Sequence, residues 1–240
     1  KEFSDVKISW KQDVISALAT IEDNPEKNLL FIFSNEFFDA FPINQYIKHE
    51  GKWHEICVIK KEEEEGYDFG FTHFDYTSAI KKHLEIMDIE EDSVKNGEIV
   101  EVSNDVIEIY TESLRKLKKN KGCIMTIDYG FTKTEFNSTL QSLKNHQKNE
   151  VLTNIGEADI TYLVNFEFLF YISQNEGLSV LPPITQKMFL ESIGILEKQI
   201  LLEKEPDEAK RYALERSTER LISELQMGEL FKVLICEHYK

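Results

Sequence analysis

The sequence predicts an α/β fold built on a mainly parallel sheet, and three features point to it. Leu29 to Phe33 is an unbroken apolar run, entered through Asn24-Pro25 and left through Ser34-Asn35, as expected of a strand that helices bury on both faces. A second such run spans Gly122 to Gly130. The segment before it has helical periodicity, and a helix that leads into a buried strand is typical of α/β domains.

Between the two strands, the sequence predicts a β insertion over residues 44–75. Three extended segments between Ile43 and Phe74 indicate it: "INQYIKH", "WHEICVIKK" and "YDFGFTHF". Glu50-Gly51 and a glutamate run that ends at Gly66 separate them. We therefore expect an inserted antiparallel hairpin or meander. A helix near residues 76–86 and a short strand at residues 99–102 should follow.

Residues 103–121 have the marks of a complete helix. Ser103 or Asn104 can cap its start, since either side chain can accept from the first free backbone amides. Lysines crowd the last turn, where the helix dipole favours cations, and Gly122 follows as a stop. Apolar residues recur at helical spacing within it: Val106, Ile107, Tyr110, Leu114 and Leu117.

Four further elements are expected downstream. Residues 165–174 and 185–193 have helical patterns, and Gly194 ends the second. Residues 207–225 should form a long amphipathic helix, and residues 230–236 a final strand. We expect that strand to be antiparallel and to lie at an edge of the sheet.

Length and composition are those of a globular chain. With 240 residues, 41% hydrophobic and 30% charged, it can bury a substantial core, and we expect residues 1–240 to form a single domain in which residues 132–194 are a mainly helical lobe. The net charge of −16 argues against nucleic acid as a partner, because phosphate binding needs clustered lysine and arginine.

The cysteines indicate a reducing compartment. Cys57, Cys123 and Cys236 are odd in number and widely spaced, so we expect reduced core thiols and no disulfide framework or metal site. No secretory signal and no apolar run of about 20 residues are visible, so we expect a protein that is neither secreted nor membrane-spanning.

Polar side chains follow both buried strands where each strand ends. Asn35, Glu36 and Asp39 come after the first, and Asp128 and Tyr129 after the second. Because ligands of open α/β sheets bind beyond the carboxyl ends of the strands, these residues are candidates for one polar site. The alternative is structural: Asn35 or Asp39 caps a turn, and Asp128 satisfies loop amides.

Several kinds of site have no sequence support. The six histidines are scattered without metal-ligand spacing, and no G-x-S-x-G nucleophile motif occurs. No G-x-G-x-x-G loop follows a strand, since the closest glycines are Gly66 and Gly70 in the extended region.

The motifs taken together resemble the MidA family of S-adenosylmethionine-dependent methyltransferases. "SNEFFDAFPINQY" is similar to the family's "NE-x-x-DA-x-P" signature. Further segments match in order from about Ile8 to Leu234: "ISWKQDV", "GEIVEVS", "GCIMTIDYG", "TLQSLKNHQKNEVLTNIGEADITYLVNF", "TQKMFLESIGI" and "MGELFKVL".

The resemblance implies a class I, Rossmann-like methyltransferase sheet in which the strands ending at Phe33 and Ile127 are the fourth and fifth. It implies S-adenosyl-L-methionine as cofactor, near Asn35 and Phe38, and methyl transfer to an arginine of a partner protein, in mitochondrial relatives for respiratory complex I assembly. Glu36 and Asp39 would orient the guanidinium as catalytic residues. The residues implied on the substrate side are Asp128, Tyr129, Glu157, Asp159 and Thr161.

The resemblance covers only the C-terminal part of the family pattern. The glycine-rich cofactor loop has no counterpart here, so the fold is expected to be truncated at its N-terminus, and Asn165 stands where the family usually has Asp. We therefore expect this chain alone to bind the cofactor weakly, and a partner that is either the protein substrate or an N-terminal half-enzyme. The alternative function is an inactive interaction or assembly module. The resemblance places the protein in the bacterial cytoplasm or the mitochondrial matrix.

Overall fold

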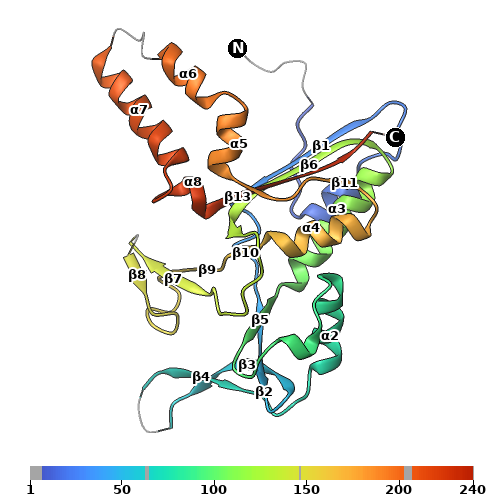
Figure 1. Cartoon of the computed structure of the whole chain (residues 1–240), viewed down its shortest axis with the longest axis vertical. Coiled ribbons are helices and arrows are strands. Elements are labelled where there is room, and N and C mark those ends of the chain that lie inside the picture. Colours follow the sequence, from blue (N-terminus) through green and yellow to red (C-terminus); the bar gives the residue numbers. More distant parts are fainter. Residues whose placement is uncertain (1–6, 63–64, 146, 203–206, 240) are drawn as a thin grey trace.

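The computed structural model describes residues 7–62, 65–145, 147–202 and 207–239. Its central sheet has the strand order β1-β6-β13-β11 (Figure 1). β1 (Leu29–Asn35) pairs in parallel with β6 (Lys121–Phe131), and β13 (Phe231–His238) pairs antiparallel with β6. Both expected parallel strands and the antiparallel orientation of the last strand are therefore confirmed.

The last strand does not lie at an edge, contrary to expectation. β11 (Ser179–Val180) and β12 (Ile184–Thr185) both pair with the side of β13 that faces away from β6. β10 (Val164–Asn165) extends the sheet beside the end of β6. These strands are two residues long, too short for a periodic pattern to reveal them.

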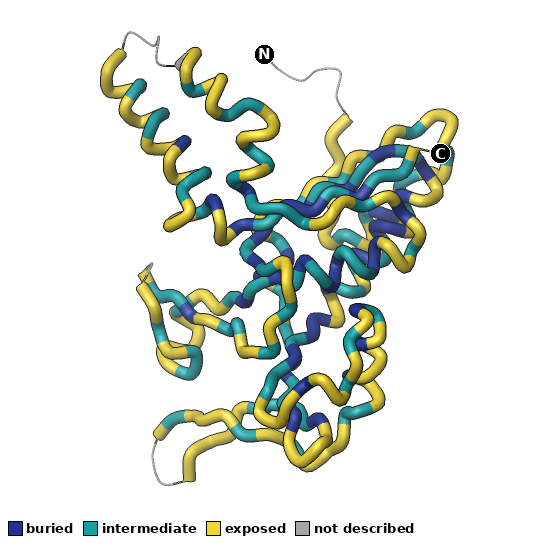
Figure 2. Tube along the Cα trace, in the orientation of Figure 1, coloured by how far each residue is buried: buried dark blue, intermediate teal, exposed yellow. Residues whose placement is uncertain are grey.

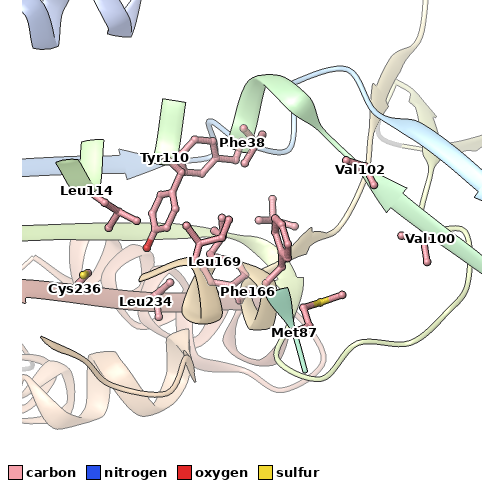
Figure 3. Packing of buried hydrophobic residues seen from close by; sticks show 14 of the residues in the cluster. Phe38, Met87, Val100, Val102, Tyr110, Leu114, Phe166, Leu169, Leu234 and Cys236 are labelled. Atoms are coloured by element: carbon pink, nitrogen blue, oxygen red, sulfur yellow. The ribbon is translucent and has the colours of Figure 1, made fainter. Parts of the chain in front are cut away.

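One face of the central sheet is covered by helices and forms the main core. α3 (Asn104–Lys118) and α4 (Phe166–Asn175) pack on it, with Tyr110, Leu114 and Leu169 against Leu234 (Figure 3). The Tyr110 hydroxyl is satisfied by Ser173 Oγ at 2.8 Å.

The helix at α3 matches the sequence pattern closely. The Ser103 side chain accepts from the Val106 amide, so Ser103 is the N-cap and Asn104 is the first helical residue. The helix ends at Lys118, earlier than expected, and Gly122 already belongs to β6. The short helix α1 (Val14–Ala19), which the sequence did not reveal, packs against α3.

The opposite face of β1 is open, so the expectation that helices bury this strand on both faces is wrong. Leu29, Phe31 and Phe33 are 76%, 59% and 54% exposed, and the strand alternates between exposed and half-buried residues (Figure 2). Within the part of the chain that the structure describes, β6 is the only strand that pairs with β1. β1 is thus an edge strand with an uncovered apolar face.

The face of the central sheet that is open at β1 is covered at β13 by the helices near the C-terminus. They are α5 (Gln186–Ser192), α6 (Ile195–Leu202), α7 (Glu208–Ile222) and α8 (Met227–Leu230). A small second core joins them to the sheet, with Phe189 and Met227 packed against Ile127, Phe231 and Val233.

The expected antiparallel meander is present, and it gains a fourth strand. β2 (Asn44–His49), β3 (Lys52–Lys60) and β4 (Tyr67–Phe71) pair in order, and β5 (Ile99–Val102) closes the other side of β2. Two helices lie between β4 and β5 in the chain, α2 (Thr77–Ile86) and the single turn η1 (Glu91–Ser93).

The region 132–194 is not mainly helical. Among its described residues, the helices are α4 and α5 alone. A third antiparallel sheet is formed by β7 (Gln141–Lys144), β8 (Gln147–Asn149) and β9 (Asp159–Thr161). Asparagine and glycine favour tight turns there, with Asn154 and Gly156 both at positive φ.

The cysteines are free in the structure, but only Cys236 is buried in the core, and Cys57 and Cys123 are partly exposed. No helix among the described residues has the length and apolar character needed to span a membrane.

Candidate functional site

The predicted site residues begin in the loop that leaves β1. Glu36 has a left-handed backbone, with φ of 47°, and its amide donates to the Ile127 carbonyl of the neighbouring strand at 3.1 Å. This hydrogen bond lies at the end of the β1–β6 ladder, so it fixes the start of the loop at the carboxyl ends of both strands. A non-glycine residue in this conformation costs backbone energy, and such strain often occurs at functional sites.

Asp128 holds that loop from the end of β6. Its Oδ2 accepts from the amides of Phe37, Phe38 and Asp39 at 3.1, 2.9 and 3.4 Å, and its Oδ1 accepts from the Tyr129 amide at 2.9 Å. The side chain is fully buried. The structural alternative, in which Asp128 satisfies loop amides, therefore matches its contacts. A substrate-binding role for Asp128 stays a prediction.

Three acidic groups crowd this strand end. Burial, and after it the nearby Asp39 carboxylate, raises the pKa of Asp128 to about 6. Burial and then the charge of Glu36 raise the pKa of Asp39 above its ordinary value. Such crowding disfavours the simultaneous ionisation of all three groups, and carboxyl groups with perturbed pKa values are frequent at functional sites.

Tyr129 joins the second strand end to the first. Its hydroxyl donates to Glu36 Oε2 at 3.3 Å, and its ring packs on Phe231 with centroids 4.1 Å apart. Burial, followed by the charge of Glu36, raises the pKa of Tyr129 to about 12, so its hydroxyl stays protonated at neutral pH.

A first cavity of about 450 Å³ lies on the β1 side of the loop. Asn35 and Phe38, the two residues that the family resemblance assigns to the cofactor, both line it. Phe38 is nevertheless 4% exposed and packs against Tyr110, so it also belongs to the core (Figure 3). The remaining lining is mostly apolar and includes Ile32, Phe33 and Phe37.

A second cavity, a groove of about 420 Å³, lies on the other side of the same loop. Asp39 and Thr161, predicted separately from two distant motifs, both line it. The rest of its lining is contributed by residues of the 40–45 segment, β3, β4 and β9, together with Leu140 and Tyr162. Residues 35–43 thus contribute to both cavities, with different side chains in each.

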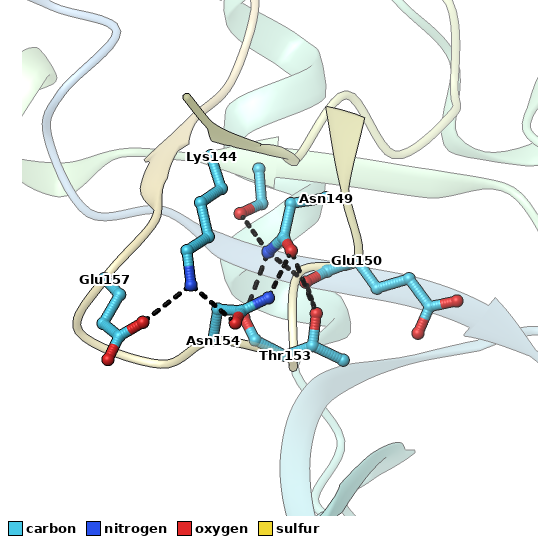
Figure 4. Close-up of polar contacts among 7 residues, drawn as sticks. Lys144, Asn149, Glu150, Thr153, Asn154 and Glu157 are labelled. Atoms are coloured by element: carbon cyan, nitrogen blue, oxygen red, sulfur yellow. Dashed lines mark hydrogen bonds and ion pairs between the residues drawn. The ribbon is translucent and has the colours of Figure 1, made fainter. Parts of the chain in front are cut away.

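Glu157 and Asp159 do not line either cavity. Glu157 pairs with Lys144 at 2.6 Å, and Lys144 also donates to Asn154 at 2.8 Å (Figure 4). Asn149 organises the same turn through its side-chain amide (Figure 4). The structure shows a turn-stabilising role for Glu157, and its role in substrate binding stays a prediction, as it does for Asp159.

Asn165, which stands where the family usually has Asp, lines neither of these cavities. Its side chain accepts from the Phe168 amide at 3.0 Å as the N-cap of α4, and its amide donates to Thr134 Oγ1 at 3.1 Å. Asparagine caps helices about as well as aspartate, so the change from the family's usual Asp preserves this function.

Two site-forming residues were missed from sequence. The Tyr162 hydroxyl donates to the Phe38 carbonyl at 3.0 Å, which ties the third sheet to the loop. Gln45 is buried beside the groove, where its amide donates to Glu101 and Ser138 at 2.7 Å each. Neither residue type in isolation signals a site. Across the residues that the structure describes, no group of three or more His, Cys, Asp or Glu side chains could hold a metal ion.

Comparison with known proteins identifies the family. Residues 2–184 match the model of a family described as "Putative S-adenosyl-L-methionine-dependent methyltransferase". The chain belongs to this family. The MidA resemblance is thereby confirmed.

Named relatives agree with the family assignment. The chain is 31% identical over 215 residues to the mitochondrial protein arginine methyltransferase NDUFAF7 of Danio rerio, and 30% identical over 232 residues to that of Rattus norvegicus. These alignments include 89% and 95% of this chain and 48% of each relative. The chain therefore spans about half the length of the curated relatives that it matches.

Solved structures share the fold of this chain. Two solved structures from Burkholderia thailandensis superpose with TM-scores of 0.72 and 0.71 at 23% and 24% identity. Each superposition includes 90% of this chain, and 57% and 55% of the respective neighbour. The second neighbour was solved with S-adenosyl-homocysteine bound. These findings show a methyltransferase-like α/β fold, and none of them supports the alternative of an inactive module.

Proposed function

We propose that this chain forms the acceptor side of an S-adenosyl-L-methionine-dependent methyltransferase that modifies an arginine of a partner protein. The observation that carries the proposal is the loop of residues 35–43, which lines two different cavities. Asn35, Phe37 and Phe38 line one, and Asp39 lines the other. The cofactor would occupy the first cavity and the substrate arginine the second. Glu36 is exposed on the loop that the two cavities share, and it lines neither of them.

The first cavity fits part of the cofactor. Its apolar walls suit an aromatic ring, and the Asn35 amide offers both a donor and an acceptor at its rim. S-adenosyl-L-methionine, when bound, supplies a methyl group carried on a positively charged sulfur. The glycine-rich loop of the family has no counterpart among these 240 residues. We propose that residues outside this sequence, joined to it or on another chain, supply that loop and pair with the free edge of β1.

The carboxylates suit a guanidinium acceptor. Arginine presents a planar fork of N–H donors that carboxylates accept in bidentate fashion, and Glu36 and Asp39 are the acceptors at this strand end. The hydrogen bond from Tyr129 fixes one oxygen of Glu36 and leaves the other available. Methylation releases one proton from the guanidinium, and Asp39, whose pKa burial raises, is placed to receive it.

Asp128 acts here as a positioning residue. By accepting three successive amides it fixes the direction in which the loop carries Glu36 and Asp39. Displacement at a methyl group requires the reacting atoms in line, so the reaction depends chiefly on such positioning.

The mitochondrial names of the relatives support the mitochondrial matrix as one of the two expected compartments.

The test uses the complete enzyme, meaning the full-length protein or these residues co-expressed with the coding sequence directly upstream. Incubation with S-adenosyl-L-methionine and arginine-containing protein should yield methylarginine by mass spectrometry. Glu36→Gln should lower the rate about a hundredfold, and Glu85→Gln on the exposed side of α2 should leave it unchanged. Methylation that is equally fast in Glu36→Gln, or that falls on lysine instead of arginine, would contradict the proposal.

A further inference from the structure

The groove beside Asp39 lies between two strand edges that lack partners. β2 pairs with β3 only as far as Glu55, so residues 56–60 of β3 pair with β4 alone. β9 pairs with β7 on one side only. Within the described ranges, no further strand pairs with either of these edges, and the backbone groups of an unpaired edge can pair with a further chain.

The chemistry of the groove is mainly apolar with one acidic end. Its rim carries Val58, Phe69 and Ile160, which are 55%, 44% and 51% exposed. Asp39 is the only carboxylate in the lining, and the lining contains no lysine or arginine. Such a surface complements an extended peptide that has alternating apolar side chains and one cationic side chain.

We propose that this groove binds an extended segment of the protein substrate, which adds as a strand to the free edge of β3 and directs one arginine to Asp39. The inference rests on the proposed function for the identity of the cation. It adds the mode of recognition: backbone pairing with β3, apolar contacts with Phe69 and Ile160, and selection of an arginine that lies in extended chain.

Strand addition explains why the groove joins two sheets. A segment held between β3 and β9 would run over residues 39–43, which form part of the lining. Its cationic side chain would then enter at the end where Asp39 and Glu36 concentrate negative charge. An arginine in a rigid turn or helix could not present its backbone to the β3 edge, so such sites should be poor substrates.

Binding can be measured without cofactor or methyl transfer. The probe is a fluorescent peptide in which valine and threonine alternate around one central arginine, and its partner probe carries citrulline in place of arginine. Fluorescence anisotropy should show saturable binding of the arginine peptide, with affinity lower by about tenfold for the citrulline peptide. Equal affinity for the two peptides, or no saturable binding of either, would overturn the proposal.

Two thiols report where the peptide lies. Cys57 lines the groove, whereas Cys123 lies on β6 in the central sheet, and both are partly exposed. The arginine peptide should slow modification of Cys57 by a thiol reagent about tenfold and leave that of Cys123 unchanged. Protection of Cys57 that grows with protein concentration in the absence of peptide would identify a second copy of this chain as the occupant, and would overturn the proposal.

Substitutions on each wall complete the test. Phe69→Asp and Ile160→Asp should each weaken peptide binding about tenfold, while Phe74→Asp, at an exposed phenylalanine outside the lining, should not. Circular dichroism confirms folding, and the variants alter opposite walls, so a folding defect in one leaves the other informative. If the complete enzyme methylates protein arginine but both wall variants keep the parental KM, the groove proposal fails and the proposed function stands. If the peptide binds but the complete enzyme methylates no protein arginine, the groove proposal stands and the proposed function fails.

Discussion

The hydroxyl of Tyr129 donates to the carboxylate of Glu36 across 3.3 Å, and this contact joins side chains from the ends of two parallel strands. Glu36 sits at φ of 47°, where a non-glycine residue is uncommon. The hydrogen bond therefore supports a side chain whose backbone is already fixed by the Ile127 carbonyl. Glu36 is held at both backbone and side chain while remaining exposed to solvent.

The contact predicts coupled effects on methyl transfer. In the complete enzyme, Tyr129→Phe should lower kcat about tenfold, because Glu36 loses its orienting donor. Once Glu36→Gln is present, the same Tyr129→Phe change should have little further effect, which gives a coupling energy of about 1 kcal/mol in a double-mutant cycle. Additive losses would show that Tyr129 acts independently of Glu36, for example on the acceptor itself.

The buried Asp128 predicts a pH-dependent stability. Its pKa is about 6 in the folded chain and lower when unfolded, so the folded state binds the proton more tightly. The contribution of this group to the unfolding free energy is therefore greatest below about pH 4 and falls as pH rises through about 6. Asp128→Asn should remove this slope, worth about 1–3 kcal/mol in denaturant titrations across that range.

A charge control accompanies that measurement. Asp92→Asn removes one negative charge from an exposed position, and it separates the loss of a buried carboxylate from a change in net charge. If the difference between wild type and Asp128→Asn has the same size at every pH, the proton linkage assigned to Asp128 is wrong.

Adding a side chain at Gly122 should have a large steric cost that is specific to this position. A Cβ on Gly122 would lie 1.8 Å from the Leu30 carbonyl oxygen, so β1 and β6 could not keep their pairing. Gly122→Ala should lower the unfolding free energy by about 3 kcal/mol. Gly51→Ala is the matched control, since Gly51 also has positive φ but nothing within 4 Å, and it should cost only about 1 kcal/mol. Equal costs would mean that backbone strain alone explains Gly122.

The elements that could be predicted from sequence are those with long periodic or apolar patterns. β1, β6, α3 and the meander of β2, β3 and β4 all follow from local runs of several residues. The grouping of Asp39 with Asp128 followed from the rule that parallel strands end at one edge, and their electrostatic interaction agrees with it.

Other features depend on contacts that a local pattern does not contain. The sequence left open whether Asp128 binds a ligand or satisfies loop amides, and only the structure decides its contacts. It could not show that Thr161 would line the groove of Asp39 while Glu157 would pair with Lys144. The exposure of Phe31 is a third case, because an apolar strand reads as buried whether or not the covering layer is part of the chain.

The open face of β1 predicts self-association and weak cofactor binding. Without a partner for that edge, these 240 residues should associate in a concentration-dependent way in sedimentation velocity, and calorimetry should give a dissociation constant for S-adenosyl-L-methionine of about 1 mM or weaker. Phe31→Lys should reduce the association, whereas Leu225→Lys, at a position 97% exposed and away from the sheet, should not. A monodisperse monomer that binds the cofactor with micromolar affinity would contradict the need for further residues at β1.

Substitutions of Asn165 test whether this residue acts as a helix cap or takes part in catalysis. Asn165→Ala should lower the unfolding free energy by about 1 kcal/mol, because the Phe168 amide loses its acceptor. Asn165→Asp restores the family's usual residue, and it should keep stability and leave methyl transfer by the complete enzyme within about twofold of wild type, since either side chain caps α4. A large gain of activity in Asn165→Asp would instead place the lost charge in the reaction, even though the cap lies outside both cavities that the loop of residues 35–43 lines.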